Sequence, residues 1–419
     1  MSDTGNTMIV IGAGAAGMMA SITAAEAGAN VTLLEKNDAL GRKLLITGNG
    51  RCNLTNIREG GDFISGYFQG GQFLRDAIKA LPPEGLLGFF RKRGVEFKVE
   101  EDGKVFPVTD RAADIVDTLK SALNETGVNV LCGSRVRDIK ISDGMANGVI
   151  LANGKEFQGG AVVLASGGLS YGSTGSSGDG YPMAENAGHR IIGLRPGLVA
   201  LNTEEDMSCL EGLSVEDVIV SFVSGRKKVR AGRGSLIFTR KGVSGPVIIS
   251  SSAKIIDAFE SGPGVRIELN FCGGSNVEEV SRELTAMLAA SPNKDAVRIV
   301  GEFVPRRLAE LITARSGIGI GIKANMVKKE ARAEAARELA AFPMTIVSSR
   351  PMEEAMVTRG GVSLKEIDPR TMASRIVKGL FLAGEIIDVD GDTGGFNLQA
   401  AFSTGFLAGR SAALIVAGR

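Results

Sequence analysis

The 419-residue chain contains no tryptophan and a single histidine, His189. A metal site built from several histidines is therefore excluded, and any histidine-centred mechanism depends on this one residue. The four cysteines, Cys52, Cys132, Cys209 and Cys272, are too far apart for a CxxC motif. We expect neither a structural zinc site nor a disulfide framework, and we predict no metal site.

The sequence also lacks any hydrophobic run long enough to cross a bilayer, and its polar first residues do not resemble a signal peptide. Its 48 Lys and Arg residues nearly balance 47 Asp and Glu residues. Bulk attraction to nucleic acid or to an anionic membrane is therefore not expected. We predict a cytoplasmic protein whose partners include neither a nucleic acid nor a membrane.

Glycine is the residue in excess, with 57 copies, roughly twice the average usage. Three of these glycines form a GxGxxG pattern between two apolar runs, residues 8–11 and 31–34. The residues between the pattern and the second run are rich in helix formers. This order of strand, glycine turn, helix and strand predicts a βαβ unit.

Within this unit, each glycine has a physical role in a dinucleotide site. Gly12 permits the tight turn, Gly14 lets the backbone approach a pyrophosphate, and Gly17 lets the helix pack closely on the sheet. Glu35 ends the second run, where its carboxylate can accept both hydroxyls of an adenosine ribose. An acid here repels a 2′-phosphate, which argues against NADP. The fingerprint alone does not distinguish NAD from FAD.

The segment after Glu35, GRKLLITGNGRCN at residues 41–53, is rich in glycine and basic residues. It is suited to wrap a ribityl-pyrophosphate chain, with Arg42, Lys43 and Arg51 as cations. The alternative, an exposed surface loop, is disfavoured by the apolar residues between these cations. A flavin disulfide reductase is excluded because such enzymes place two cysteines beside the ring, and this segment has only Cys52.

The rest of the chain changes in texture. The sequence predicts an all-β segment from residue 191 to about 275, followed by a helical segment to about 342. The C-terminal part that follows has the same strand and glycine pattern as the first domain. The first domain is therefore expected to be discontinuous. The chain ends in one apolar helix, residues 396–417, rich in small residues.

Three segments carry a resemblance to a known family. Residues 41–53 resemble the GRK…SGGGRCN signature of the BaiN/YhiN-like family of NAD(P)/FAD-dependent oxidoreductases. Residues 379–399, GLFLAGEIIDVDGDTGGFNLQ, are similar to its second signature. Residues 238–246 resemble its FTHxGLSGP segment, with Arg240 in place of the histidine.

The resemblance runs from about residue 8 to 415 and implies an α/β fold. A Rossmann-like FAD-binding domain would comprise residues 1–190 and 359–419. A β-barrel-like domain, residues 191–275 and 343–358, and a small helical domain, residues 276–342, would be inserted in it.

A more distant likeness links the chain to the fumarate reductase and succinate dehydrogenase flavoproteins. Residues 177–181, SGDGY, are similar to their TGDG turn, and residues 360–385 are similar to their GGI…RT…GLYAAGE run. By this likeness Asp179 and Glu385 hold the ribityl and pyrophosphate region of FAD. Asn397 and Leu398 meet the flavin ring, where the first N–H groups of the last helix can stabilise the negative charge of the reduced flavin.

Together the two resemblances imply that FAD is the cofactor. The predicted FAD-binding residues are Gly12, Gly14, Ala15, Ala16, Gly17, Glu35, Lys36, Gly41, Arg42, Lys43, Gly48, Gly50, Arg51, Cys52, Asn53, Val136, Ala165, Ser166, Gly167, Asp179, Gly384, Glu385, Gly395, Phe396, Asn397 and Leu398. No residue is assigned a catalytic role.

The leading hypothesis is an FAD-dependent oxidoreductase that acts on a small organic substrate. No second GxGxxG follows a strand, so NAD(P)H is expected to bind only transiently, or oxygen to accept the electrons. Two alternatives stay open. Basic stretches at residues 226–233 and 328–337 would suit a flavin-dependent RNA (tRNA) modification protein, and a nucleotide sensor without catalysis would carry the same fingerprint. No sequence pattern indicates an oligomeric state.

Overall fold

The computed structural model describes residues 7–58, 63–225, 227–262 and 264–418. The chain divides into two compact units, the first made of Met1–Gly197 and Met352–Arg419 and the second of Leu198–Pro351. These limits differ from the expected boundaries at residues 190 and 359. The reason is that strands β12 (Ile191–Gly197) and β19 (Val357–Val362), which lead out of and back into the first unit, pair with each other in an antiparallel ladder.

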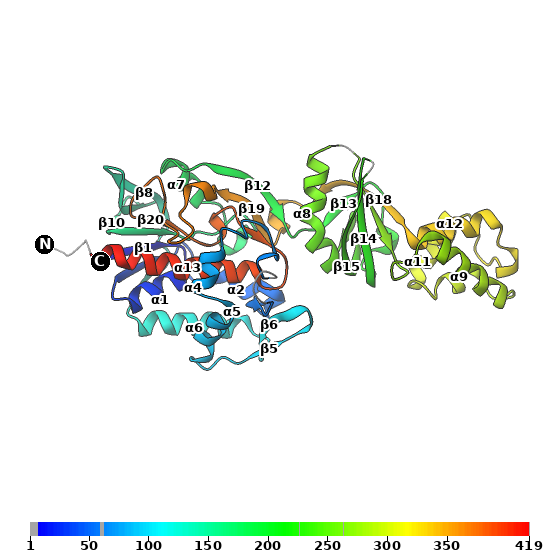
Figure 1. Cartoon of the computed structure of the whole chain (residues 1–419), viewed down its shortest axis with the longest axis horizontal. Helices are drawn as coiled ribbons and strands as arrows, with labels where there is room; N and C mark the ends of the chain where they lie inside the picture. Colours follow the sequence, from blue (N-terminus) through cyan, green and yellow to red (C-terminus); the bar gives the residue numbers. More distant parts are fainter. Residues whose placement is uncertain (1–6, 59–62, 226, 263, 419) are drawn as a thin grey trace. The chain divides into compact units, whose positions relative to one another are not determined.

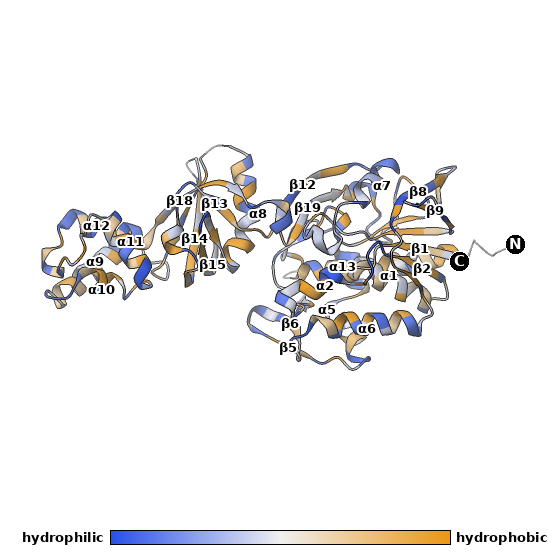
Figure 2. Cartoon of the chain, turned by 180° about the vertical axis from the view of Figure 1, so that it is seen from behind, coloured by the Kyte–Doolittle hydropathy of each residue, from blue (hydrophilic) through white to orange (hydrophobic). Residues whose placement is uncertain are grey.

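A five-stranded parallel sheet forms the centre of the first unit. Its strand order is β20 (Leu380–Leu382), β11 (Ala161–Leu164), β1 (Thr7–Ile11), β2 (Asn30–Leu34) and β7 (Asn129–Leu131). The strands read as continuous apolar runs because both faces of such a sheet are buried. Figure 2 shows β1 and β2 as mostly hydrophobic. The predicted Rossmann-type α/β class is therefore confirmed for this unit.

Helices α1 (Ala15–Glu26) and α13 (Phe396–Val416) lie side by side in this unit (Figure 1). Small residues bring their backbones into contact. A Cβ atom on Gly405 or Gly409 would lie 2.2 Å from the carbonyl oxygen of Ala16 or Ala20, respectively. The small residues of the C-terminal helix therefore serve close packing against the helix that follows the glycine turn.

The other elements of the first unit surround this core. Helix α6 (Ala112–Glu125) is amphipathic (Figure 2) and buries Ile115, Val116, Leu119 and Leu123, as its spacing predicts. The remaining helices and strands are α2 (Arg42–Ile46), β3 (Thr55–Asn56), β4 (Tyr67–Gln69), α4 (Arg75–Ala80), α5 (Pro83–Arg91), β5 (Phe97–Val99), β6 (Lys104–Pro107), β8 (Val136–Ser142), β9 (Met145–Leu151), β10 (Glu156–Gln158), α7 (Gly180–Asn186) and β21 (Asp390–Gly391).

The second unit contains a closed barrel and a group of helices. In strand order, the described barrel consists of β13 (Leu201–Thr203), β16 (Gly242–Ser244), β15 (Lys227–Thr239), β14 (Ser214–Ser224), β17 (Arg266–Asn270) and β18 (Phe342–Ser349). Helix α8 (Pro246–Glu260) follows β16. Between β17 and β18 the chain forms α9 (Val277–Ala290), α10 (Ala296–Val300), α11 (Arg306–Arg315) and α12 (Lys329–Ala340).

Hydrophobic helices such as α13 raise the question of a membrane span. Within the described ranges, no helix combines the length and the apolar character that crossing a bilayer requires.

Candidate cofactor-binding site

The glycine turn before α1 has the geometry that its sequence predicts. Gly12 has a positive φ of 97°, and a Cβ on it would lie 2.6 Å from the carbonyl oxygen of Ala165. A Cβ on Gly17 would lie 1.8 Å from the carbonyl oxygen of Gly12. Both positions require glycine, because the turn, the helix and the loop after β11 meet there through their backbones.

Gly14 differs from these two glycines because nothing lies within 4 Å of the position of its Cβ. It is the N-cap of α1, no side chain caps the helix, and the first turn has no acidic residue. Gly14 therefore has open space beside it at the positive end of the helix dipole. This is a suitable cradle for an anion such as a diphosphate.

Glu35 lies at the carboxyl end of β2 and is only 7% exposed. Its Oε2 accepts a hydrogen bond from the backbone N of Ala13 at 2.8 Å. Its Oε1 accepts from the backbone N and from Nδ2 of Asn37 at 2.9 and 2.8 Å. These three bonds fix the carboxylate beside the glycine turn and leave one of its about four lone-pair sites, on Oε2, for a ribose hydroxyl. Sequence reasoning missed Asn37, whose backbone and side-chain N–H groups both donate to the carboxylate two residues earlier.

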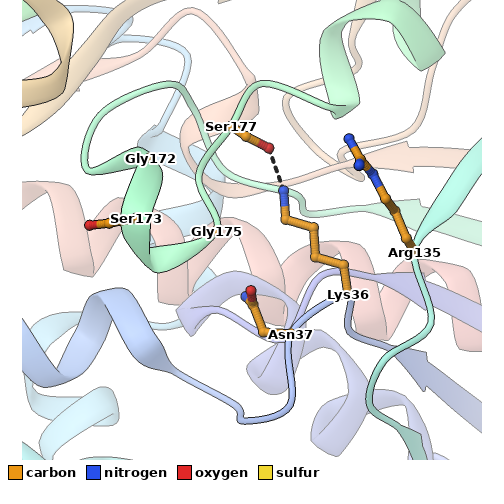
Figure 3. Close-up of a pocket in the computed structure, with 7 residues that line it drawn as sticks. All are labelled: Lys36, Asn37, Arg135, Gly172, Ser173, Gly175 and Ser177. Carbon is orange, nitrogen blue, oxygen red and sulfur yellow. Dashed lines mark hydrogen bonds between the residues drawn. The ribbon is translucent and has the colours of Figure 1, made fainter.

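A cavity of about 370 Å³ opens beside Lys36 and Asn37, the two residues that follow Glu35 in the sequence (Figure 3). Its lining residues come from the ends of two strands and from the loop before α7. They are Lys36, Asn37, Arg135, Gly172, Ser173, Gly175 and Ser177. Val136, one of the predicted FAD-binding residues, follows Arg135 and is itself buried. The cavity is therefore lined by Lys36, a predicted FAD-binding residue, and by Arg135, the neighbour of another.

Asp179 is bound by the cations of this cavity. Its carboxylate lies 3.0 Å from Nζ of Lys36 and accepts two 3.1 Å hydrogen bonds from the guanidinium of Arg135. Burial alone would raise the pKa of Asp179, but hydrogen bonds from Lys36 and Ser177 and the charge of Lys36 hold it below its usual value. The structure thus places Asp179 beside the residue that follows Glu35.

The basic segment 41–53 folds as a short helix, α2, followed by a 3-10 turn, Thr47–Gly50. Positive φ angles at Gly41, Gly48 and Gly50 let it turn back on itself. Its three cations have different partners. Arg42 donates to Oδ1 of Asn37 and to the carbonyl of Ser173, at the edge of the cavity.

Arg51 points away from that cavity and pairs with two carboxylates. It contacts Glu100, and its Nε lies 2.8 Å from Oδ1 of Asp110. Its guanidinium also lies over the ring of Phe106. The charge of Arg51 is therefore matched within the protein.

Lys43 and Glu385 form the second charged centre of the site. Nζ of Lys43 lies 2.6 Å from Oε2 of Glu385 and 2.6 Å from Oγ of Ser170. Oε1 of Glu385 accepts from the backbone N of Thr358 at 2.7 Å and from Ser170 Oγ at 2.9 Å. Sequence reasoning missed Ser170 and Thr358, each of which is separated by one residue from a glycine pair in the sequence.

Glu385 is kept ionised by these contacts. Burial alone would raise the pKa of Glu385, but the charge and hydrogen bond of Lys43 outweigh burial and hold the pKa below its usual value. Gly384, with φ of 78°, brings the loop against α1, since a Cβ there would lie 2.8 Å from the Cβ of Ala16. The Glu385 loop thus adjoins the open start of α1.

The start of α13 is held by its neighbours and has no side-chain cap. Gly395 has φ of 96°, and a Cβ there would lie 2.4 Å from the carbonyl oxygen of Thr55. The amide of Asn397 bonds the backbone N and O of Gly391 at 2.9 and 2.8 Å. With its oxygen turned toward Gly395, the Asn53 amide bridges the backbones of Thr55 and Gly395. Segment 41–53 and the second signature therefore meet at this helix start.

Phe396 and Leu398 serve mainly as packing residues. Phe396 is 1% exposed, and its ring lies 5.1 Å from that of Phe63 and 5.8 Å from that of Tyr67. Leu398 is half-buried against the core. The backbone N–H groups of the first turn of α13, rather than these side chains, are the groups suited to a ligand.

The loop after β11 contributes Ala165, Ser166 and Gly167. Ala165 donates its backbone N–H to the carbonyl of Ile11. The hydroxyl of Ser166 is buried and has no hydrogen-bond partner within the described part of the chain, and neither has the hydroxyl of Tyr181. Two unsatisfied buried hydroxyls near the start of α7 fit a site that is completed by a polar ligand.

Two residues with reactive side chains are structural instead. Cys52 is fully buried, and burial raises the pKa of its thiol to about 12. His189 is 3% exposed, with Nδ1 3.2 Å from Glu366 and Nε2 2.9 Å from Ser374. Burial lowers the pKa of His189, although Glu366 opposes this. Within the described ranges, no group of three or more His, Cys, Asp or Glu residues is arranged to hold a metal ion.

The parallel sheet, the open glycine turn and the fixed carboxylate of Glu35 define a Rossmann-type dinucleotide-binding protein. Residues 6–411 match the family described as HI0933-like protein Rossmann domain, so the chain belongs to this family. It is 32% identical over 411 residues to a 3-dehydro-bile acid delta(4,6)-reductase from Clostridium scindens, covering 97% of this chain and 99% of that protein. It is 30% identical over 403 residues to a ribosomal RNA dihydrouridine synthase from Escherichia coli, covering 94% and 95%.

A solved structure shares the fold. It is quinol fumarate reductase from E. coli, with 17% identity and a TM-score of 0.52, covering 98% of this chain and 70% of that one. The predicted family and the distant likeness to fumarate reductases are therefore confirmed. The predictions that the protein is an oxidoreductase and that FAD is its cofactor are confirmed as well.

Proposed function

We propose that this protein is an FAD-dependent reductase that reduces a carbon–carbon double bond conjugated to a carbonyl group in a small organic substrate. The observation that carries the proposal is the pair of uncapped helix starts: that of α1, which the Glu385 loop adjoins, and that of α13, which meets segment 41–53. When bound, FAD supplies the hydride chemistry.

The residues of the first unit would hold the two ends of FAD in different ways. The N–H groups at Gly14 to Ala16 would bind the diphosphate, and Glu35 would accept a hydrogen bond from a ribose hydroxyl. The adenine would occupy the cavity beside Lys36. The first turn of α13, residues 396–398, would direct its N–H groups to the pyrimidine edge of the flavin, where negative charge develops on reduction.

The names of the two relatives agree on one reaction type. A bile acid delta(4,6)-reductase and a synthase of dihydrouridine both saturate a carbon–carbon double bond, and in both substrates a carbonyl lies in conjugation with it. A carbonyl so placed makes the far alkene carbon a hydride acceptor. This shared chemistry, rather than either named substrate, supports the proposal for this chain.

Charge pairing in the second unit favours a small substrate over RNA. In the basic stretch 226–233, Lys228 pairs with Glu268 and Arg233 with Asp217; Arg226 lies outside the described residues. In the stretch 328–337, Arg337 pairs with Glu334. Such pairs reduce the positive field that a phosphate backbone requires.

RNA modification is the second candidate, supported by the name of the E. coli relative and by the exposed cations Lys227 and Arg230 on β15. Salt-sensitive binding of ribosomal RNA, lost in a Lys227→Ala/Arg230→Ala variant, would favour this candidate.

Anaerobic half-reactions test the leading proposal. The flavin-loaded protein is reduced with NADH or NADPH, and the absorbance of the flavin is followed after addition of a 3-oxo-4-ene steroid, a cyclic enone or their saturated ketones. We expect reoxidation by an unsaturated ketone and none by its saturated counterpart. Reoxidation by neither, together with reduction of uridine in ribosomal RNA, would favour the second candidate.

A further inference from the structure

Lys43 stands in the segment where a basic side chain is expected to bind the cofactor's phosphates, but its contacts point to another role. Its ammonium donates to Glu385 and to Ser170, both at 2.6 Å, and the side chains of Lys43 and Glu385 are only 24% and 20% exposed. An ammonium has three donors, so two of the three are engaged with the protein. The Glu385 carboxylate, 2.6 Å away, balances the positive charge of this ammonium.

Glu385 is in turn held from several sides. The backbone N of Thr358 and the hydroxyl of Ser170 bind Oε1, and Lys43 binds Oε2. The hydroxyl of Thr358 accepts the backbone N–H groups of residues 169 and 170, which ties the two contributors together. A Cβ on Gly168 would lie 2.4 Å from that hydroxyl. The carboxylate thus has one orientation, set by α2, β19 and the loop after β11.

We propose that Lys43 is a positioning residue that keeps the Glu385 carboxylate charged and oriented in the cofactor site, and so sets the charge balance under which bound flavin is reduced. The proposal rests on the function proposed above. Lys43 and Glu385 together carry no net charge, so the pair neither repels nor attracts the negative charge that reduction adds. Removing Lys43 alone leaves an uncompensated negative charge in the site, and removing Glu385 alone leaves an uncompensated positive charge.

Among the described residues, Lys43 is the charged side chain that acts on Glu385, and Ser170 and Tyr181 are its hydroxyl neighbours. Lys43 comes from α2, and the hydroxyls of Ser170 and Tyr181 come from the loop after β11 and from α7. Burial, and then the negative charges of Glu385 and Asp388, raise the pKa of Tyr181, so this phenol stays neutral. Lys43 is therefore the counter-charge on which the ionised state of Glu385 depends.

The first measurement uses the flavin-free protein. In Lys43→Met, Glu385 is buried without a cation, which raises its pKa in the folded state. A raised folded pKa gives stability that is present at low pH and is lost as pH rises through that pKa. We expect the unfolding temperature of Lys43→Met to fall relative to wild type between about pH 5 and pH 8. The double variant Lys43→Met/Glu385→Gln should not show this fall, and Lys43→Arg should resemble wild type.

The second measurement is the midpoint potential of the bound flavin, titrated with reference dyes. At a pH above the raised pKa of Glu385, where the unpaired carboxylate is ionised, Lys43→Met should shift the potential to more negative values. Glu385→Gln should shift it to more positive values, and the double variant should return toward wild type. The matched control is Lys140→Met, which breaks an ion pair of the same 2.6 Å length with Glu156 on the β8–β9–β10 sheet. It should leave the potential unchanged.

These outcomes separate the inference from a phosphate-binding role. If Lys43 bound phosphate, the double variant would stay as impaired in FAD binding as Lys43→Met, and that result would overturn the proposal. The same holds if Lys43→Met matches Lys140→Met in both measurements. If Lys43→Met does not fold, the proposal is tested by the midpoint potentials of the other two variants. It predicts a positive shift in Glu385→Gln and the reversal of that shift in the double variant. If the wild-type protein takes up no flavin, the proposed function fails, whereas the flavin-free comparison still decides the role of Lys43.

Discussion

Substitution of Gly14 tests the cofactor site without disturbing the fold. Its φ and ψ of −84° and −170° lie in the extended region that valine favours, and no atom lies within 4 Å of the position of its Cβ. Gly14→Val should therefore fold with nearly wild-type stability. Its three added carbons would occupy the space where the diphosphate approaches the N–H groups of α1.

The size of the effect follows from the contacts that the substitution blocks. Losing two hydrogen bonds to a charged group, each worth about 1.5–3 kcal/mol, weakens binding by about 3–6 kcal/mol. That corresponds to an increase in the Kd for FAD of about 10² to 10⁴. Calorimetric or fluorescence titration of the flavin-free protein with FAD measures this factor, and thermal unfolding checks the fold.

Gly88→Val is the matched control. Gly88 also has open space around its Cβ position, but it lies in α5 and not at the glycine turn. It should bind FAD as the wild-type protein does. A Gly14→Val protein that binds FAD with wild-type affinity would refute the assignment of the diphosphate to this helix start.

Two further predictions concern single side chains. Glu35→Arg should weaken FAD binding strongly, because it removes the carboxylate that accepts from the ribose and buries an unmatched cation. Glu35→Gln keeps the shape of the side chain and should lose less affinity. Equal affinity of Glu35→Arg and wild type, measured by the same titration, would count against this site. Iodoacetamide at about pH 8 should label the exposed Cys132 and Cys209 in the folded protein, but should label Cys52 only after unfolding, since its thiol is buried with a pKa of about 12. Peptide mass spectrometry checks this, and rapid native labelling of Cys52 would contradict the packing of segment 41–53.

The βαβ unit could be predicted in detail because its determinants are local. The apolar run of β1, the three glycines and Glu35 lie within 28 consecutive residues, from Met8 to Glu35, and the contacts of Gly17 with Gly12 and of Glu35 with Ala13 fall inside this stretch. The close approach at Gly17 and the open space at Gly14 follow from the same few positions. A single sequence contains this information in full.

Contacts between distant segments could not be predicted in this way. Arg51 was expected to bind the cofactor, yet it pairs with Glu100 and Asp110, which lie 49 and 59 residues away. Lys43 meets Glu385 across 342 residues. A basic residue near a glycine turn has the same local pattern whether it binds a phosphate or a carboxylate, so only the fold decides between these roles.

Small polar residues were missed for a related reason. Ser170 and Thr358 have ordinary hydroxyls, and their importance comes from the two loops that bring them to Glu385. The glycines near them gave a signal for close backbone approach, but not for the identity of the group approached.

The most direct test of the account is a crystal structure of the protein with FAD bound. We predict that the diphosphate lies on the N–H groups of residues 14–16, that a ribose hydroxyl contacts the Glu35 carboxylate, and that the flavin ring reaches the first turn of α13. A structure with the flavin at the Glu35 end, or with FAD bound away from the glycine turn, would contradict the account.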